Sequence, residues 1–285
     1  MHTHLISVDQ LKALQASGAP LMVFDCSFDL ADPAKADAMF AEQRIAGSVQ
    51  AHLGRDLSAP TPQDAVNGGR HPLPKQELLA QTLRRLGLEN TMQAVVYDRN
   101  GANYCGRLWW MLKWAGHDAV AVLDGGLQAW LAAGGATESG TAPARAPGRF
   151  ELKPELRRWV GTQDVARHLD QPTQTLIDAR GAPRYRGDVE PLDPIAGHIP
   201  GALNRPFGDN LGPDGRFKPS EQLKAEFAAL LAGRDAAGVV HHCGSGVSTV
   251  PNIIAMELAG YAPTALYAGS WSEWSRTPGL PVAKG

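Results

Sequence analysis

One stretch decides the fold: Gly238-Val239-Val240-His241-His242-Cys243-Gly244-Ser245-Gly246-Val247-Ser248-Thr249. An apolar β-branched run leads up to Cys243, where a short loop of small residues begins. Residues 252–258 then have the apolar spacing of a helix. This order predicts a buried strand, a tight loop and a helix.

The cysteine in this stretch is expected to lie at the N-terminus of the helix. Unpaired amides and the positive end of the helix dipole favour an anion there. Gly244 and Gly246 let the backbone curl, so that successive N–H groups converge on one point. Such surroundings stabilise a thiolate and predict that Cys243 is a nucleophile. The other interpretation is a buried cysteine that acts as a small hydrophobic side chain, a role that needs no glycine-rich loop.

The composition is that of an ordinary globular protein. The 285 residues are enough for two domains, 44% of them are hydrophobic and 20% are charged. The formal net charge of −2 and the lack of a basic run exclude a nucleic-acid surface. No apolar run reaches bilayer length and no export signal opens the chain, so we expect no membrane contact. Three widely spaced cysteines fit a reducing compartment, and the cytoplasm is the expected location.

Short apolar runs alternate with amphipathic segments along the chain. Residues 20–25, 93–98 and 119–123 have the character of buried strands. Residues 75–86 and 104–115 have helical spacing. This alternation predicts an α/β fold in which helices flank a parallel sheet.

The second half of the chain repeats the first at a constant offset. Val95-Val96 and Trp130 recur as Val239-Val240 and Trp274, each 144 residues later. We therefore predict two duplicated domains, 1–135 and 151–285, joined by a linker at 136–150. At this offset Cys243 falls on Arg99, so the first domain has no nucleophile there and is expected to be non-catalytic.

The loop resembles that of a known enzyme family. Cys243-Gly244-Ser245-Gly246-Val247-Ser248 is similar to the active-site loop of two-domain rhodanese-like sulfurtransferases, in particular to the Cys-Gly-Ser-Gly-Val-Thr form of 3-mercaptopyruvate sulfurtransferases. The resemblance extends to residues 197–202 and 269–274, and so covers nearly the whole chain. It implies tandem rhodanese-like domains without a cofactor. It also implies transfer of sulfur from 3-mercaptopyruvate or thiosulfate through a persulfide on Cys243.

The resemblance also implies a set of residues around the nucleophile. Arg186 matches a substrate-binding arginine of the family best. Arg184 is the second candidate, because residues two apart share a side if this segment is extended. The second arginine that mercaptopyruvate enzymes usually carry is missing from residues 190–194. His71 corresponds to a histidine near the cleft, and Asp56 is the nearest acid for a relay. The expected substrate-binding residues are Gly244, Ser245, Gly246, Val247, Ser248, Arg184, Arg186 and His71.

The expected partners are small molecules: an anionic sulfur donor, and a thiol or cyanide as acceptor, with thioredoxin among the thiols. One alternative is a sulfur carrier or anion-binding module without turnover. Another is a cysteine phosphatase with a His-Cys-x5-Arg loop, but Thr249 occupies the position of the arginine that this chemistry needs. No metal site is expected, because His241 and His242 are adjacent on a strand and point to opposite faces.

Overall fold

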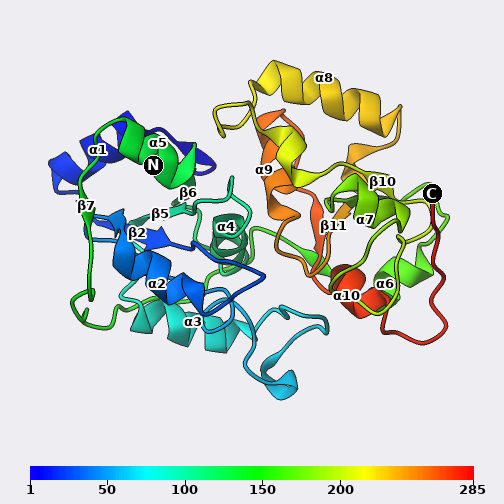
Figure 1. Ribbon diagram of the computed structural model, residues 1–285, viewed down its shortest axis with the longest axis horizontal. Coiled ribbons are helices and arrows are strands. Elements are labelled where there is room, and N and C mark those ends of the chain that lie inside the picture. The colour runs from blue at the N-terminus through cyan, green and yellow to red at the C-terminus, as the bar shows by residue number, and fades with distance from the viewer. The chain divides into compact units, whose positions relative to one another are not determined.

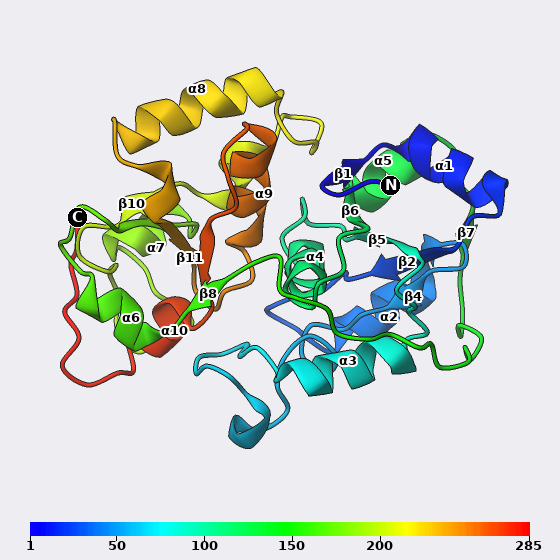
Figure 2. The ribbon, with the colours of Figure 1, turned by 180° about the vertical axis from the view of Figure 1, so that it is seen from behind.

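The computed structural model describes residues 1–285, which divide into two compact units (Figures 1 and 2). Unit 1 comprises residues 1–64, 74–156 and 213–216. Unit 2 comprises residues 65–73, 157–212 and 217–285. Unit 2 thus takes one segment, 65–73, from the first half of the sequence. None of the helices combines the length and the apolar character that a bilayer span requires.

Unit 1 is built on a five-stranded parallel sheet with the strand order β1-β6-β5-β2-β4. Two further short strands, β3 and β7, pair antiparallel beside it. The strands are β1 (Leu5–Ile6), β2 (Leu21–Asp25), β3 (Arg44–Ile45), β4 (Val49–Gln50), β5 (Gln93–Tyr97), β6 (Val120–Leu123) and β7 (Thr137–Glu138). The α-helices are α1 (Val8–Ser17), α2 (Lys35–Glu42), α3 (Gln76–Arg85), α4 (Cys105–Trp114) and α5 (Gly126–Ala132).

One face of this sheet is covered by α1 and α5, which lie together above it in Figure 1. Leu11 of α1 and Trp130 of α5 are buried in one cluster with Val23 and Val95 of the sheet. Ser7 caps α1 and forms a capping box with Gln10, which satisfies amides that the first turn leaves unpaired. The apolar residues of these helices therefore face the sheet, as the sequence predicts.

Unit 2 repeats this plan with a parallel sheet in the order β10-β9-β11-β12-β8. Its strands are β8 (Trp159–Val160), β9 (Thr175–Asp178), β10 (Leu203–Asn204), β11 (Val239–His242) and β12 (Ala265–Tyr267). Its α-helices are α6 (Thr162–Arg167), α7 (Ala182–Arg186), α8 (Ser220–Leu231), α9 (Val250–Leu258) and α10 (Ser270–Trp274).

Helices bury both faces of the second sheet. Trp271 and Trp274 of α10 pack with Val240 and Tyr267 on one face. Phe227 of α8 and the apolar residues of α9 pack on the other. Figure 2 shows β11 between these two layers. A strand covered on both sides is buried along its length, which explains the apolar Val239 and Val240, while His241 and His242 complete the strand as buried polar residues.

The two sheets have equivalent strand orders, with β5 in the middle of one and β11 in the middle of the other. This confirms the predicted duplication and the α/β class. In parallel sheets of this kind, ligands bind at the carboxyl ends of the strands. The loops that follow β5 and β11 are therefore the places to compare.

Candidate active site

The candidate nucleophile lies where the sequence predicts it, directly after β11. Residues 243–249 form the loop, and α9 begins at Val250 with Pro251 in its first turn, where the missing amide costs nothing. Gly246 has a φ of +72°, and a Cβ atom built there would lie 2.4 Å from the carbonyl oxygen of Ala268. The loop can therefore close only with glycine at this position.

The loop amides are not used by the protein. The N–H groups of Gly244, Ser245, Val247 and Ser248 donate no hydrogen bond within the chain. Cys243 is 1% exposed and is the first residue of this loop, which leads into the nine-residue helix α9. Buried backbone donors are normally satisfied, so a run of free amides beside a thiol is suited to holding an anion.

The first turn of α10 holds the loop from the other side. Trp271 N donates to the carbonyl oxygen of Cys243 over 3.0 Å, and Ser272 N donates to that of Gly244 over 2.8 Å. The amide of Cys243 donates to Ser270 Oγ over 3.1 Å. Ser270 has a φ of +54°, a backbone conformation that costs a residue with a Cβ atom about 1–2 kcal/mol. The fold keeps this strained residue at the point where it fixes the nucleophile.

Segment 65–73 covers the loop within unit 2. His71 Nδ1 is hydrogen-bonded to Ser245 Oγ at 2.9 Å, so these two expected site residues lie together. Arg70 N donates to Ser272 Oγ over 3.0 Å. Gly69 has a φ of +93°, and its backbone passes so close to Gly269 that a Cβ atom would lie 2.8 Å from that residue's carbonyl oxygen. Asp56 belongs to unit 1, where its carboxylate accepts from the amide of His52 and pairs with the side chains of Arg85 and Arg55.

The two arginines that the sequence singles out have different surroundings. The segment that carries them is helix α7 and not an extended chain, which corrects the expectation that both point to one side. A Cβ atom built on Gly244 would lie 3.4 Å from Nη1 of Arg184, so Arg184 faces the loop. Arg186 points elsewhere: its side chain is 47% exposed and its Nη2 is 2.7 Å from Asp188. Side chains two positions apart on a helix differ in direction by about 200° around its axis, which explains why Arg184 and Arg186 point to different sides.

A third arginine, Arg70, faces the same glycine, and the sequence reasoning missed it. Its Nη2 would lie 3.1 Å from a Cβ atom on Gly244. Its Nη1 donates to the buried carboxylate of Asp193 over 2.8 Å. The only signal in the sequence is its place beside His71 in a polar, glycine-rich loop, where an arginine is usually a solvated surface charge.

Buried polar groups behind the loop are neutral or paired. His241 and His242 are fully buried, and neither ring has a hydrogen-bond partner. Burial lowers the pKa of His241 to about 3, and burial also lowers the pKa of His242 against the opposing charge of Asp178. No cluster of three or more His, Cys, Asp or Glu side chains is placed to hold a metal ion.

The equivalent loop of unit 1 also has backbone amides that need acceptors, and a side chain of the protein provides them. Asp98 follows β5, and its carboxylate accepts hydrogen bonds from four loop amides at 2.8–3.1 Å, those of Asn100, Ala102, Tyr104 and Cys105. The anion of this loop is therefore a side chain of the protein itself. Burial raises the pKa of the Cys105 thiol, and the charge of Asp98 raises it further, so this cysteine is held as the neutral thiol. Burial likewise raises the pKa of Cys26.

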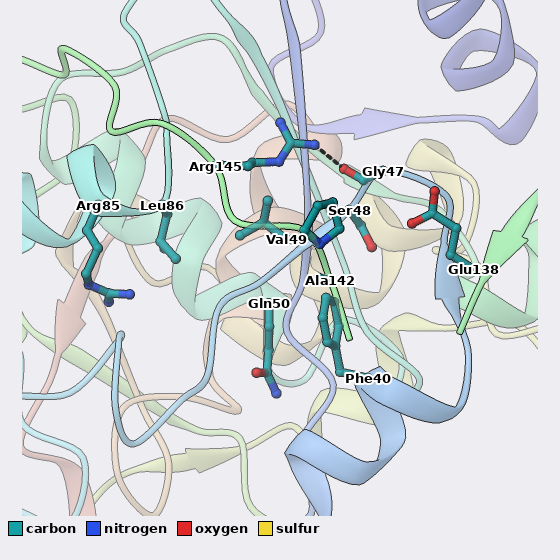
Figure 3. Close-up of a pocket in the computed structure, with 11 residues that line it drawn as sticks. Phe40, Gly47, Ser48, Val49, Gln50, Arg85, Leu86, Glu138, Ala142 and Arg145 are labelled. Atoms are coloured by element: carbon teal, nitrogen blue, oxygen red, sulfur yellow. Dashed lines mark hydrogen bonds between the residues drawn. The ribbon is translucent and has the colours of Figure 1, made fainter. Parts of the chain in front are cut away.

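Unit 1 also has a cavity of about 200 Å³ between β4, α2 and residues 142–145 (Figure 3). Its walls are largely apolar, and Arg145 Nη2 donates to the carbonyl oxygen of Gly47 over 2.5 Å at its rim. No cysteine or histidine lines it. The lining residues are Phe40, Gly47, Ser48, Val49, Gln50, Arg85, Leu86, Glu138, Ala142, Pro143 and Arg145.

Comparison with known proteins agrees with this geometry. The model of the rhodanese-like domain matches residues 7–133 and 161–277. The chain is 46% identical over 282 residues to a Pseudomonas aeruginosa protein named "Probable 3-mercaptopyruvate sulfurtransferase", covering 99% of this chain and 98% of the relative. It is 33% identical over 271 residues to human 3-mercaptopyruvate sulfurtransferase, covering 92% and 88%. The crystal structure of SseA from Escherichia coli, described with the fold of 3-mercaptopyruvate sulfotransferases, has a TM-score of 0.79 at 28% identity, covering 95% of this chain and all of that one.

Proposed function

The chain belongs to the rhodanese-like family and is a sulfurtransferase, and we propose that it takes sulfur from 3-mercaptopyruvate and holds it as a persulfide on Cys243. The observation that carries the proposal is the set of free amides in the loop that begins at Cys243. A thiolate and a persulfide are both anions, and the same donors stabilise both. The relatives at 46% and 33% identity are named for 3-mercaptopyruvate, and a Mycobacterium tuberculosis relative at 38% identity is named "Putative thiosulfate sulfurtransferase SseB". The name of the 46% identical relative supports 3-mercaptopyruvate as the donor to test first.

The proposed reaction has two half-reactions. The Cys243 thiolate attacks the sulfur of 3-mercaptopyruvate and forms an S–S bond. The C–S bond breaks, its electron pair goes to carbon, and the resulting enolate takes a proton to give pyruvate. This proton is the one that the donor's thiol carried: we assign its relay from sulfur to carbon to the hydrogen-bonded pair of Ser245 and His71, and the persulfide is left as an anion. The outer sulfur of the persulfide is then attacked by a thiol or by cyanide, which leaves with that sulfur and returns Cys243 as thiolate.

The remaining loop residues hold the anion during both steps. Gly244, Gly246, Val247 and Ser248 bring their backbone around the sulfur, and Arg184 receives the negative charge of the donor. Arg186 is paired with Asp188 and is left out of this assignment. Thioredoxin is an acceptor of the right chemical class, because it presents a nucleophilic thiol.

The division of labour between the halves follows from the loops. We propose that residues 1–135 form a non-catalytic domain, that 136–150 link the halves, and that 151–285 carry the nucleophile. Asp98 fills the amide cradle of the first copy, which supports the absence of chemistry there. Three free cysteines, all buried, agree with work in the reducing cytoplasm.

Intact-mass spectrometry tests the proposal. The protein is incubated with 3-mercaptopyruvate without an acceptor, and we expect a gain of one sulfur atom that cyanide removes. The Cys243→Ser variant should gain none, whereas Cys105→Ala, which removes a buried neutral thiol, should gain sulfur like the wild type. An adduct that persists in Cys243→Ser refutes the assignment. An adduct on Cys243 that no acceptor removes favours a sulfur carrier without turnover.

A further inference from the structure

We propose that Arg70 binds the carboxylate of the sulfur donor together with Arg184, and that Asp193 is the positioning residue for both. This inference rests on the proposed function, because it concerns the donor of the same reaction. It adds a substrate-binding residue from the first half of the sequence and restricts the donor to molecules that carry a carboxylate at a distance from the sulfur.

The guanidinium group of Arg70 is anchored on one side and open on the other. Nη1 donates to Oδ1 of Asp193 over 2.8 Å, whereas Nη2 has no partner in the protein. Nε is buried and also has no hydrogen-bond partner. The side chain is 22% exposed, so it is held against the protein and does not extend into solvent. An arginine in this state has donors left for a ligand.

Arg184 is anchored in the same way by two carboxylates. Its Nε and Nη2 donate to Glu190 over 3.2 and 2.6 Å, and Nη2 lies 3.4 Å from Oδ2 of Asp193. Its Nη1 has no partner. The free amino group of each arginine is the one near Gly244, at 3.1 Å for Arg70 and 3.4 Å for Arg184 from the position of a Cβ atom there.

Asp193 explains why two positive groups can stand so close together. Its side chain is fully buried, and its two oxygens receive Arg70 and Arg184 separately. A buried carboxylate between two guanidinium groups offsets their repulsion and fixes both orientations. Arg276 Nη1 donates to the same carboxylate over 3.0 Å and to the carbonyl oxygen of Ser272, but its side chain is 50% exposed, against 22% for Arg70. It therefore serves as a matched control.

The two free amino groups suit a planar oxyanion. Arginine binds carboxylates through paired N–H donors in one plane, and two arginines can each take one oxygen. The site next to them is the backbone of Gly244, adjacent to the nucleophile, where a side chain would contact both guanidinium groups. A donor that fits has a carboxylate at one end and a thiol a few bonds away, as 3-mercaptopyruvate does.

Steady-state kinetics with 3-mercaptopyruvate and a thiol acceptor test the role of Arg70. We expect Arg70→Gln to raise KM by about 10- to 100-fold, because charge-assisted hydrogen bonds to substrate are lost, and to change kcat by less than about threefold. Arg70→Lys keeps the positive charge but lacks the paired N–H donors of a guanidinium group, and its KM should lie between those of Arg70→Gln and the wild type. Arg276→Gln should raise KM by no more than about threefold. A KM within twofold of the wild type in both Arg70 variants overturns the proposal, and so does an equal rise in Arg276→Gln.

A binding measurement separates this inference from the reaction itself. Pyruvate, the product, retains the carboxylate, and its binding to Cys243→Ser can be measured by calorimetry without any sulfur transfer. Arg70→Gln in that background should weaken pyruvate binding by at least tenfold. If the wild type forms no persulfide but pyruvate binding still depends on Arg70, the proposed function fails and the carboxylate site stands. If persulfide forms normally and pyruvate binding is indifferent to Arg70, the inference alone is overturned.

Discussion

Substitutions of Ser270 should distinguish the energetic cost of its left-handed backbone conformation from the stabilisation that its hydroxyl hydrogen bonds provide. Ser270 Oγ accepts from the amide of Cys243 over 3.1 Å and donates to the carbonyl oxygen of Tyr267 over 2.9 Å. The equivalent residue in unit 1 is Gly126, which has nearly the same φ, +57° against +54°. One copy therefore adopts this conformation with glycine, and the copy with the nucleophile adopts it with serine.

The structure gives the size of the expected effects. Ser270→Ala leaves the buried amide of Cys243 unpaired, which costs about 1–3 kcal/mol, and keeps the strain. We expect the opening free energy of the loop to fall by about 2 kcal/mol, so that amide exchange is about 30-fold faster. Ser270→Gly loses the same hydrogen bonds but relieves a strain of about 1 kcal/mol, so its loop should exchange several times more slowly than that of Ser270→Ala.

Hydrogen exchange read by mass spectrometry on peptides from residues 239–249 measures these differences. Ser275→Ala is the control, because Ser275 is a buried serine at the end of the same helix whose hydroxyl has no hydrogen-bond partner. It should leave exchange in the loop unchanged. The reasoning fails if Ser270→Ala exchanges like the wild type. It also fails if Ser270→Gly proves less protected than Ser270→Ala, since the backbone at this position would then carry no strain.

Two further predictions concern buried ionisable side chains. Asp98→Asn should destabilise unit 1 by about 2–4 kcal/mol in urea unfolding, because charge-assisted bonds to backbone amides weaken, while persulfide formation on Cys243 is retained; undiminished stability would contradict this. Burial lowers the pKa of His241 to about 3 from 6.5, so between these values the unfolded chain binds more protons and stability falls as the pH is lowered. Between pH 7 and pH 5 this one group should cost about 2 kcal/mol, and urea unfolding of His241→Phe should show a dependence on pH that is weaker by that amount. An equal pH dependence in both proteins would mean that His241 titrates normally.

Much of the fold could be predicted because it depends on local patterns and on repetition. The apolar run before Cys243 and the glycines after it determine a strand, a loop and a helix with little help from distant residues. The offset of 144 residues predicts the same elements in the first half, and the equivalent strand orders of the two sheets confirm this. Pro251 lies in the first turn of α9, the one place in the helix where it is tolerated.

The arginines show where sequence reasoning stops. Residues 182–186 are too few for a helical period to be visible, so the sequence predicts an extended segment with Arg184 and Arg186 on one side. The preference for Arg186 comes from the family resemblance alone. Arg70 could not be found, because its place depends on contacts with Asp193 and Ser272, which are 123 and 202 residues away in the chain. A long-range ion pair leaves no periodic signal in a single sequence.

The two loops also support the proposal that only the second copy is catalytic. Both follow the middle strand of a parallel sheet, and both need a negative charge for their amides. In unit 1 a carboxylate that belongs to the chain supplies it permanently, so there is no room for a second anion. In unit 2 the residue equivalent to Asp98 is His242, which is buried and whose ring has no hydrogen-bond partner, so the loop amides have no internal anion. Under the proposed function they hold the transferred sulfur instead. Under the proposed function, the first half of the sequence contributes to the site by position, because segment 65–73 brings His71 and Arg70 to the loop of unit 2. The active site is thus compact in space but discontinuous in sequence, and a fragment limited to residues 151–285 would keep the nucleophile while losing two of the side chains that face it.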